Sequence, residues 1–301
     1  MYQTSVTHFY YCRFLQFYLC VGSSTPISDG ETKSKRKYEK TFDIDISIVV
    51  PAYNEESRLP TMMKDTLEYL QKKIDEGKLF RTAEIVIVND GSKDKTMEQI
   101  LEYTRNYPTS KKLCVRGVNQ VQNQGKGSAV KQGSLYSRGR YILFTDADGA
   151  TDIRGLDTVF NECKSMDTNG KSCAIGSRKE DGSQVERHAL RNFLSWVMHK
   201  IVQFVLKNNI KDTQCGFKIF TRDAAKLVFP TQHLERWSFD VEVLYLLGQQ
   251  RVPVREVGVV WNEIEGSHLN VVEASIQMLR DMFLIKFLYT VRLWRQTDVT
   301  Y

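Results

Sequence analysis

The sequence predicts an α/β fold, a mostly parallel sheet flanked by helices. Two observations predict it: short apolar, β-branched runs alternate with longer helical stretches from residue 44 onward, and polar clusters follow the runs. This alternation is typical of right-handed βαβ units. With 42% hydrophobic and 26% charged residues, the 301-residue chain has the composition of an ordinary globular protein and can bury a sizeable core.

Four strands and three helices are expected in the first half of the chain. The expected strands are 44–50, 84–89, 113–118 and 141–145, and the expected helices are 56–76, 95–107 and 126–138. In such sheets ligands bind beyond the carboxyl ends of the strands. Polar clusters follow three of these strands, at 51–56, 90–92 and 146–148. A binding site is therefore expected at that edge of the sheet.

The second half of the chain is expected to contribute two helices of a different kind. Residues 188–207 carry one apolar stripe at i, i+3, i+4 and i+7 spacing, and residues 272–294 are helical, with 282–294 apolar nearly all round. Neither segment is long or clean enough to predict a membrane span. Both suit an amphipathic helix lying in the membrane interface, and packing on the globular core is the alternative.

The N-terminal 43 residues are expected to stand apart from the main domain. Residues 8–21 are aromatic and apolar, but the run is shorter than the ~20 residues that a membrane span needs. Residues 22–40 have the composition of a polar linker. A signal-anchor, an interfacial segment and a truncated anchor all fit. The expected domains are an N-terminal segment over 1–43, one large domain over 44–270 that includes helix 188–207, and a C-terminal interfacial helix and tail over 271–301.

The charge pattern does not favour nucleic acid as a partner. The net charge is +6, with a basic cluster at 33–37 and further basic residues near the two apolar helical segments rather than in a stripe. This pattern suits an anionic membrane surface or phosphorylated substrates at least as well as DNA. The six cysteines form no Cys-x-x-Cys pair and have no histidine at zinc spacing, so reduced thiols are expected.

Two carboxylates at the end of the fourth expected strand are the main candidates for a metal site. Asp146 and Asp148 lie one residue apart, where like charges repel and each resists desolvation. A divalent cation relieves that cost, and Mg²⁺ is typically held by one or two carboxylates together with substrate phosphates. The pattern therefore predicts a metal–diphosphate site, with a solvated turn as the alternative.

Two further segments suit a nucleotide. Asp90 follows the second expected strand, where its carboxylate can accept a hydrogen bond from a nucleobase or a ribose. Residues 123–127, which include Lys126, precede a helix and offer backbone N–H groups and an ammonium to a phosphate. The P-loop pattern is absent. An ordinary turn and helix cap is the alternative for both.

Together these segments resemble the sugar-nucleotide domain of the family-two inverting glycosyltransferases, which have the GT-A fold. Later strings resemble, in order, the dolichyl-phosphate β-glucosyltransferases of that family: 146–151, 175–178, 211–218, 235–242 and 261–267. The resemblance implies inverting transfer of glucose from UDP-glucose to dolichyl phosphate at the endoplasmic reticulum membrane, with the catalytic domain facing the cytosol. The product would be dolichyl β-D-glucosyl phosphate, for lipid-linked oligosaccharide assembly in protein N-glycosylation.

The resemblance also implies roles for residues on the donor side. Asp146 and Asp148 would bind Mg²⁺ or Mn²⁺ on the diphosphate, and Lys126 would lie near the nucleotide. Gln214, within the 211–218 string, is a further candidate for substrate binding. The uracil and ribose would be held by Pro51, Tyr53, Glu55 and Asp90.

The nucleophile would be a phosphate oxygen of the lipid, whose second pKa is about 6, so a strong base is less necessary than for a sugar hydroxyl. Bringing two anionic substrates together calls for guanidinium and ammonium groups. Asp240 and Glu242 resemble the position where hydroxyl-directed relatives keep their base, and either could instead orient Arg236 or the sugar. A catalytic role is expected for Asp146, Asp148, Arg178 and Asp240. The candidates for the acceptor phosphate are Arg178, Arg187, Arg191 and Lys218.

Two departures from related patterns define the competing interpretations. Related dolichyl-phosphate mannosyltransferases carry a metal-binding Gln where this chain has Ala150, and the glucosyltransferases carry a Lys where it has His268. A mannosyltransferase using GDP-mannose is the rival within the class, and Ala150 and the 237–240 string favour glucose. A catalytically silent nucleotide-sugar or membrane-binding module is the rival from another class. It is disfavoured by the intact Asp90, Lys126, Asp146 and Asp148.

Overall fold

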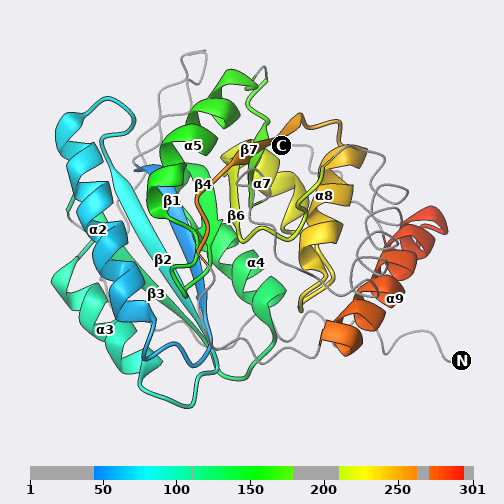
Figure 1. Cartoon of the computed structure of the whole chain (residues 1–301), viewed down its shortest axis with the longest axis horizontal. Coiled ribbons are helices and arrows are strands. Elements are labelled where there is room, and N and C mark those ends of the chain that lie inside the picture. The colour runs from blue at the N-terminus through cyan, green and yellow to red at the C-terminus, as the bar shows by residue number, and fades with distance from the viewer. Residues whose placement is uncertain (1–43, 110, 168, 179–209, 263–270, 295–301) are drawn as a thin grey trace, which may run out of the picture. The chain divides into compact units, whose positions relative to one another are not determined.

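The computed structural model of the chain describes residues 44–109, 111–167, 169–178, 210–262 and 271–294 (Figure 1). Several expectations fall outside these ranges and stay predictions: the N-terminal segment 1–43, the apolar stripe at 188–207, Arg187, Arg191 and His268. Among the helices within the described ranges, none is both long enough and apolar enough to cross a membrane.

Seven strands of the described chain form one sheet in the order β3-β2-β1-β4-β6-β5-β7. β6 runs antiparallel to its neighbours β4 and β5, and the other neighbouring pairs are parallel. The expected mostly parallel sheet is therefore confirmed, and the four expected strands are present with slightly longer bounds. The strands are β1 (Ile44–Ala52), β2 (Ala83–Asp90), β3 (Leu113–Gln120), β4 (Gly139–Thr145), β5 (Cys173–Ser177), β6 (Phe217–Thr221) and β7 (Val254–Gly258).

Helices cover both faces of the sheet. On β4, the ring of Tyr141 lies 4.7 Å from that of Phe160, whereas the ring of Phe144 lies 5.8 Å from that of Phe239. Because successive strand residues point to opposite faces, the helices that carry Phe160 and Phe239 lie on opposite sides of the sheet. The helical elements are α2 (Leu59–Glu76), α3 (Thr96–Asn106), α4 (Lys126–Tyr136), η2 (Ile153–Gly155), α5 (Leu156–Ser165), α7 (Arg222–Val228), α8 (Phe239–Gln249) and α9 (Val271–Thr290).

The first expected helix begins three residues later than its sequence suggests, at Leu59 instead of residue 56. The Glu55 carbonyl accepts hydrogen bonds from the N–H groups of Arg58 and Leu59 at 3.0 and 2.8 Å, which closes a turn ahead of α2. Pro60 then occupies the first helical turn, where its missing N–H has no intrahelical partner to lose. The residues after β1 consequently form a loop at the carboxyl edge of the sheet.

The core is built on the buried strands β1, β2 and β4, and α4 approaches them closely. A Cβ atom added to Gly133 of α4 would lie 2.4 Å from the Val49 side chain, so only glycine permits this distance. The residues of β1 and β2 that face the helices are almost all inaccessible to solvent. Each buried aliphatic side chain stabilises the fold by about 1.5–3 kcal/mol. This packing fixes the first residue of α4, Lys126, at the carboxyl edge.

The sheet order brings the predicted polar clusters together. β1 has β2 on one side and β4 on the other, with Ala52 opposite Asn89 and Val49 opposite Phe144. The chain reverses its direction of strand addition at this point, where α/β sheets form a ligand-binding crevice. The clusters after β1, β2 and β4 therefore share one edge, as expected.

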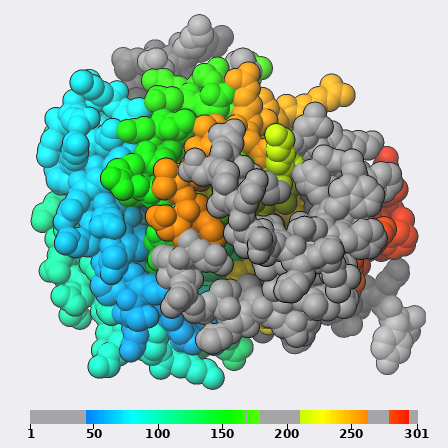
Figure 2. Space-filling model, in the orientation of Figure 1, coloured from blue at the N-terminus to red at the C-terminus, as the bar shows by residue number. Residues whose placement is uncertain are grey.

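The C-terminal helix expected over 272–294 is present as α9, which ends at Thr290. Val291–Trp294 form turns, with Arg292 at a φ of 59°. Met282 and Ile285 of α9 are fully buried in the core, and part of the helix reaches the surface (red in Figure 2). Its expected location in a membrane interface stays a prediction.

Candidate active site

The two predicted metal ligands lie directly beyond β4. Both side chains are half-buried. The Oδ1 atom of Asp146 lies 2.5 Å from Nζ of Lys126 at the start of α4. The Oδ1 atom of Asp148 accepts a hydrogen bond from the Ala150 N–H at 2.9 Å. Asp146 is therefore paired with a cation from another element, while Asp148 keeps one carboxylate oxygen away from this local turn.

Gly216, directly before β6, lies against Asp146. A Cβ atom at position 216 would be 2.1 Å from Oδ2 of Asp146, far inside van der Waals contact. The backbone before β6 can therefore reach the Asp146 carboxylate only because residue 216 has no side chain. The sequence marked this glycine only as part of a longer string.

A second ion pair lies behind Lys126. Lys218 of β6 is fully buried, and its ammonium donates hydrogen bonds to Asp240 and, at 2.8 Å, to the Cys215 carbonyl. Burial raises the pKa of the Asp240 carboxyl, and the ammonium groups of Lys218 and Lys126 oppose that shift. Burial alone would lower the pKa of Lys126, but the carboxylates of Asp146 and Asp240 outweigh it and raise that pKa. Opposite charges thus alternate from Lys218 to Asp146.

This arrangement bears on two predicted site residues. Lys218 was expected to contact the acceptor phosphate, but its side chain is inaccessible and its ammonium is engaged by Asp240. Asp240, expected to be catalytic, is 4% exposed. In this structure the Asp240 carboxylate is close enough to Lys126 to help raise the pKa of that lysine. Direct contact of Lys218 or Asp240 with a substrate stays a prediction.

Asp90, at the end of β2, organises the loop before α4. Its two carboxylate oxygens accept the N–H groups of Gln124 and Gly125 at 2.7 and 2.9 Å. Burial raises the pKa of Asp90, and these two hydrogen bonds oppose the shift. Gly91 has a φ of 70°, and a Cβ there would be 2.6 Å from the Asn123 nitrogen. The Asp90–Gly91 turn therefore holds the loop that presents Lys126.

The loop after β1 brings a third carboxylate toward the pair. Glu55 makes two 2.7 Å hydrogen bonds with the Arg58 guanidinium. Burial raises the pKa of Glu55, Arg58 opposes the shift, and the nearby carboxylates of Asp148 and Asp146 add to it. Tyr53 in the same loop is 42% exposed, and Pro51 is half-buried. The loop thus combines one accessible aromatic ring with one restrained carboxylate.

Arg178 follows β5 and is held by a residue that the sequence did not single out for this role. Its guanidinium donates two hydrogen bonds to Asp212, at 2.8 and 2.7 Å, and its carbon Cζ lies 5.6 Å from the centre of the Trp261 ring. The hydrogen bonds that Arg178 donates to Asp212 raise the pKa of its guanidinium, so the group stays charged. The side chain is 34% exposed, so part of a pre-oriented cation remains accessible.

The other predicted residues and two tryptophans complete the surroundings. Gln214 is exposed in the segment before β6, and Glu242 is fully buried in α8. Trp237 is 50% exposed, with its ring centre 5.9 Å from Nζ of Lys126. Trp261 is 38% exposed. Neither tryptophan was predicted as a site residue, since an aromatic residue in a sequence more often indicates core than site.

The protein side chains at the site can hold a hard divalent cation only if a bound ligand supplies some of the coordinating oxygens. In the part of the chain that the structure describes, no group of three or more His, Cys, Asp or Glu side chains is arranged to hold a metal ion. The two carboxylates of Asp146 and Asp148 match the protein share of a Mg²⁺ or Mn²⁺ site whose remaining ligands are phosphate oxygens and water. Lys126 and Arg178 add fixed cations, so the site can bind and orient phosphorylated molecules.

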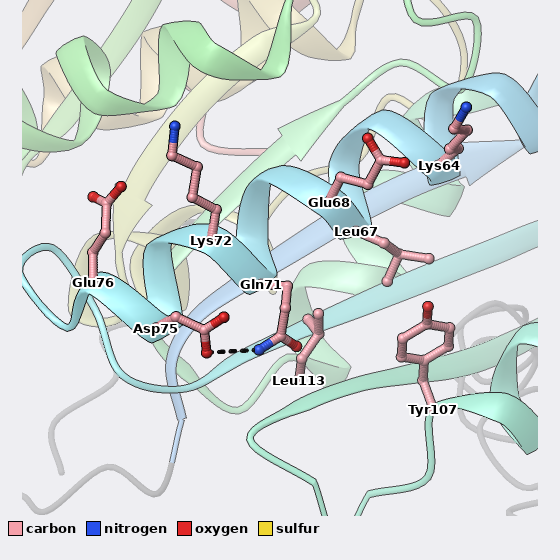
Figure 3. Close-up of a pocket in the computed structure, with 9 residues that line it drawn as sticks. All are labelled: Lys64, Leu67, Glu68, Gln71, Lys72, Asp75, Glu76, Tyr107 and Leu113. Carbon is pink, nitrogen blue, oxygen red and sulfur yellow. Dashed lines mark hydrogen bonds between the residues drawn. The ribbon is translucent and has the colours of Figure 1, made fainter.

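A separate pocket of about 800 Å³ lies along α2, near the start of β3 (Figure 3). Its walls carry Lys64, Lys72, Glu68 and Asp75 around the apolar Leu113. Leu113 is the first residue of β3, so this pocket lies at the amino end of the sheet, opposite the carboxylate pair. Its charges are mixed and do not converge on one ligand type. The chemistry therefore belongs to the carboxyl edge.

Comparison with known proteins identifies relatives over most of the chain. Residues 47–229 match Glycosyl transferase family 2. The dolichyl-phosphate beta-glucosyltransferase of Dictyostelium discoideum is 43% identical over 256 residues, which cover 84% of this chain and 77% of that protein. The protein of the same name from Homo sapiens is 42% identical over 255 residues, with 83% and 77% coverage.

A solved structure shares the fold at low sequence identity. The glucosyl-3-phosphoglycerate synthase of Mycobacterium tuberculosis, in complex with Mn²⁺ and UDP-glucose, superposes with a TM-score of 0.54 at 15% identity. The superposition covers 81% of this chain and 79% of that chain. Together with the sheet order, this similarity confirms the GT-A architecture expected from the sequence.

The close contact between Gly216 and Asp146 predicts that a side chain at position 216 weakens metal binding. Gly216→Ala should displace the Asp146 carboxylate, because the added methyl carbon would lie 2.1 Å from its Oδ2 atom. Displacing a metal ligand through its neighbour typically costs about 10- to 100-fold in metal affinity. We expect that loss in Mn²⁺ affinity in the presence of UDP, measured by electron paramagnetic resonance of free Mn²⁺.

Gly155→Ala is the matched control, because its Cβ would contact only apolar carbons, a Val259 methyl group at 3.2 Å, the Val259 Cβ at 3.5 Å and the Phe217 ring at 3.8 Å. Its Mn²⁺ affinity should equal that of the wild type. Wild-type Mn²⁺ affinity in Gly216→Ala would contradict the assignment of Asp146 as a ligand.

Proposed function

The chain belongs to glycosyltransferase family 2 and, within it, to the dolichyl-phosphate β-glucosyltransferases, and we propose that it transfers glucose from UDP-glucose to dolichyl phosphate with inversion. The observation that carries the proposal is the Asp146–Asp148 pair beside Lys126 at the carboxyl edge of the sheet. The names of the relatives support the glucosyl group and the lipid acceptor. The occurrence of Mn²⁺ and UDP-glucose in a protein of the same fold supports the donor.

The proposed product is dolichyl β-D-glucosyl phosphate, which would serve lipid-linked oligosaccharide assembly in protein N-glycosylation. We propose that the catalytic domain works at the endoplasmic reticulum membrane and faces the cytosol, as the family resemblance implies. Protease added to intact microsomes should then digest the domain. Full protection of the domain from that protease would contradict this orientation.

On the donor side, Asp146 and Asp148 would hold Mg²⁺ or Mn²⁺, which as a Lewis acid stabilises the departing diphosphate. Lys126 can turn from Asp146 to the same phosphates, since its ammonium already lies 2.5 Å from that carboxylate. The exposed ring of Tyr53 is available to stack on the uracil, and the half-buried Pro51, two residues earlier, is a further candidate for that contact. Glu55 and Asp90 would support the nucleoside through the loops that they restrain.

On the acceptor side, a phosphate oxygen attacks the anomeric carbon of glucose. The bond from that carbon to the UDP oxygen breaks, and its electron pair leaves with UDP, so one displacement converts an α-linked donor into a β-linked product. A phosphate monoester has a second pKa of about 6 and is largely ionised at pH 7. Deprotonation of the nucleophile is therefore not required of the protein. Its task is to orient two anions, for which a fixed guanidinium is suited.

Arg178 is the first candidate for the acceptor phosphate, because Asp212 fixes its guanidinium while part of it stays accessible. Gln214, two residues after Asp212, is exposed and stays a candidate for substrate contact. Arg187 and Arg191 remain candidates on the sequence alone. For Lys218 and Asp240 we propose an indirect role, in which the buried pair sets the charge and position of Lys126.

Glucose is favoured over mannose by the relatives' names and by Ala150, the second residue after Asp148. Ala150 is 6% exposed, its N–H donates to Asp148, and its carbonyl accepts the Asn262 N–H at 2.8 Å. This residue therefore supplies no side-chain ligand where mannosyltransferases are expected to carry one. A cation at the site would therefore have a phosphate oxygen of the donor or a water molecule in place of a side-chain ligand from residue 150.

A donor panel tests the proposed function. The purified chain, incubated with Mn²⁺ and a short polyprenyl phosphate, should release UDP and form a glucosyl lipid from UDP-glucose, and should form no mannosyl lipid from GDP-mannose. Asp148→Ala should lower kcat by at least about 100-fold while the thermal melting curve stays unchanged, because the loss falls on the charged transition state. Mannosyl transfer, or full activity of the variant without metal dependence, would contradict the proposal.

The proposed role of Arg178 predicts that its loss weakens binding of the acceptor more than binding of the donor. Arg178→Ala should raise the KM for the acceptor phosphate about 10- to 100-fold, because hydrogen bonds to charged groups are worth about 1.5–3 kcal/mol. The Kd for UDP-glucose should change far less. Arg255→Ala removes another surface guanidinium, one that pairs with Glu162 at 2.6 Å, and should leave both constants unchanged. A larger loss in UDP-glucose binding than in acceptor binding would assign Arg178 to the donor.

We also propose that α9 meets the cytosolic leaflet with its outward side. Phe283 and Phe287 are each 60% exposed, and Leu293 just beyond the helix is 70% exposed. Arg280 and Arg292 are also exposed, so basic groups accompany these apolar side chains. Burying an aromatic side chain gains on the order of 2 kcal/mol, and each basic residue near an anionic leaflet contributes about 1 kcal/mol. Apolar contact should therefore dominate.

The double substitution Phe283→Asp and Phe287→Asp should reduce binding to anionic phosphatidylserine vesicles and activity toward long-chain acceptors by at least about 100-fold, from the apolar term alone. Turnover of a short, water-soluble polyprenyl phosphate should persist. Leu101→Asp alters an exposed apolar residue of α3 and should affect neither measurement. Complete release of the wild type by high salt would show that charge, not apolar contact, dominates binding. Equal loss on both acceptors would show that these residues serve the fold instead of the membrane.

A further inference from the structure

The inward side of α9 carries polar side chains, and they hold the loop that leads into α8. This loop, residues 233–238, contains the exposed Trp237, whose ring centre lies 5.9 Å from Nζ of Lys126. Lys126 in turn lies 2.5 Å from Asp146. The position of the loop is therefore part of the environment of the candidate site.

The first link from α9 to the loop runs through Glu242. This fully buried carboxylate accepts the N–H of Leu234 at 2.6 Å and the N–H of His233 at 2.9 and 3.0 Å. The hydroxyl of Tyr289 on α9 donates to the same carboxylate at 2.8 Å. The Glu242 carboxylate thus joins α9 to the start of the loop. These hydrogen bonds account for its burial without a role as a catalytic base.

Two further contacts join the same elements. At the other end of the loop, the Ser238 hydroxyl donates to Asp281 of α9 at 2.7 Å, and this contact is buried. Beyond the helix, the Trp294 ring stacks on His233, with centres 4.2 Å apart and an angle of 3° between the planes. α9 and the residues that follow it therefore contact both ends of the loop, directly at Ser238 and His233 and through Glu242.

The loop also packs tightly on the start of α4, which carries Lys126. The Ser128 N–H donates to the Glu235 carbonyl at 2.9 Å. A Cβ atom on Gly125 would lie 2.5 Å from the Glu235 oxygen, and one on Gly127 would lie 2.7 Å from the Leu234 oxygen. With so little space between the two backbones, a shift of the loop has to shift the residues on both sides of Lys126.

We propose that Tyr289 and Asp281 are positioning residues for the transfer reaction, which act through loop 233–238 on Lys126. The proposal rests on the proposed function in one respect, that Lys126 serves the donor diphosphate. α9 then has two separate tasks: its outward side meets lipid, and its inward side sets the donor site. The second task does not require a membrane.

The test compares Tyr289→Phe and Asp281→Asn with Thr290→Ala, using a short, water-soluble polyprenyl phosphate without vesicles. Thr290 neighbours Tyr289, but its hydroxyl donates only to the Lys286 carbonyl of its own helix. Tyr289→Phe and Asp281→Asn should each lower kcat and weaken UDP binding about tenfold, the scale expected for a small misplacement of a binding group. The KM for the acceptor should stay near the wild-type value, and Thr290→Ala should match the wild type throughout.

Amide hydrogen exchange supplies a readout that does not depend on turnover. Residues 233–238 should exchange faster in Tyr289→Phe and Asp281→Asn and at the wild-type rate in Thr290→Ala. If the wild-type chain failed to transfer glucose, the proposed function would fall, and UDP affinity and exchange would still test the positioning role. Wild-type kcat and UDP affinity in both variants, with or without faster exchange, would overturn it.

Discussion

The site depends on keeping several negative charges close together at the end of one buried strand. Asp146 and Asp148 follow β4 directly, and Glu55 is near enough for their charges to raise its pKa. Two like charges about 4 Å apart repel by about 4 kcal/mol near a protein surface. The chain opposes this repulsion with the alternating order Lys218, Asp240, Lys126, Asp146. Lys126 pairs with Asp146 and Lys218 with Asp240, so each of these four charges has an opposite charge beside it.

The same electrostatic order explains several backbone features. Lys126 can reach Asp146 only if α4 starts close to the sheet edge, which Asp90 secures by accepting two N–H groups from the preceding loop. The approach of the β6 backbone to Asp146 requires Gly216, and that of loop 233–238 to α4 requires Gly125 and Gly127. These glycines and ion pairs therefore act together to hold Lys126 beside Asp146 at the carboxyl edge of the sheet. In the proposed function this arrangement would present the carboxylates of Asp146 and Asp148 and the ammonium of Lys126 to the donor diphosphate, with the ion pair of Lys218 and Asp240 buried next to them.

Much of the fold followed from the sequence, because β-branched runs with polar ends specify both the strands and the edge at which a parallel sheet binds ligands. The positions of Asp90, Asp146 and Lys126 at this edge were predicted in this way. The role of Lys218 was not, because a lysine in a short strand is ordinarily expected to be exposed, and its partner Asp240 lies 22 residues away. The Arg178–Asp212 pair, separated by 34 residues, was missed for the same reason. Long-range pairing of charges depends on strand order, and the position of antiparallel β6 between β4 and β5 is not encoded in any local pattern.

The proposed role of Asp146 and Asp148, which would join a cation to the donor diphosphate beside Lys126, can be measured by ³¹P relaxation of UDP in the presence of Mn²⁺ and the protein. A paramagnetic ion held on the diphosphate by both carboxylates should strongly shorten the relaxation times of the α- and β-phosphorus atoms in the wild-type complex. The effect should fall to that of Mn²⁺ and UDP alone when both residues are replaced by Asn. Equal relaxation with the wild type and with the double variant would show that these two carboxylates do not hold the cation on the diphosphate.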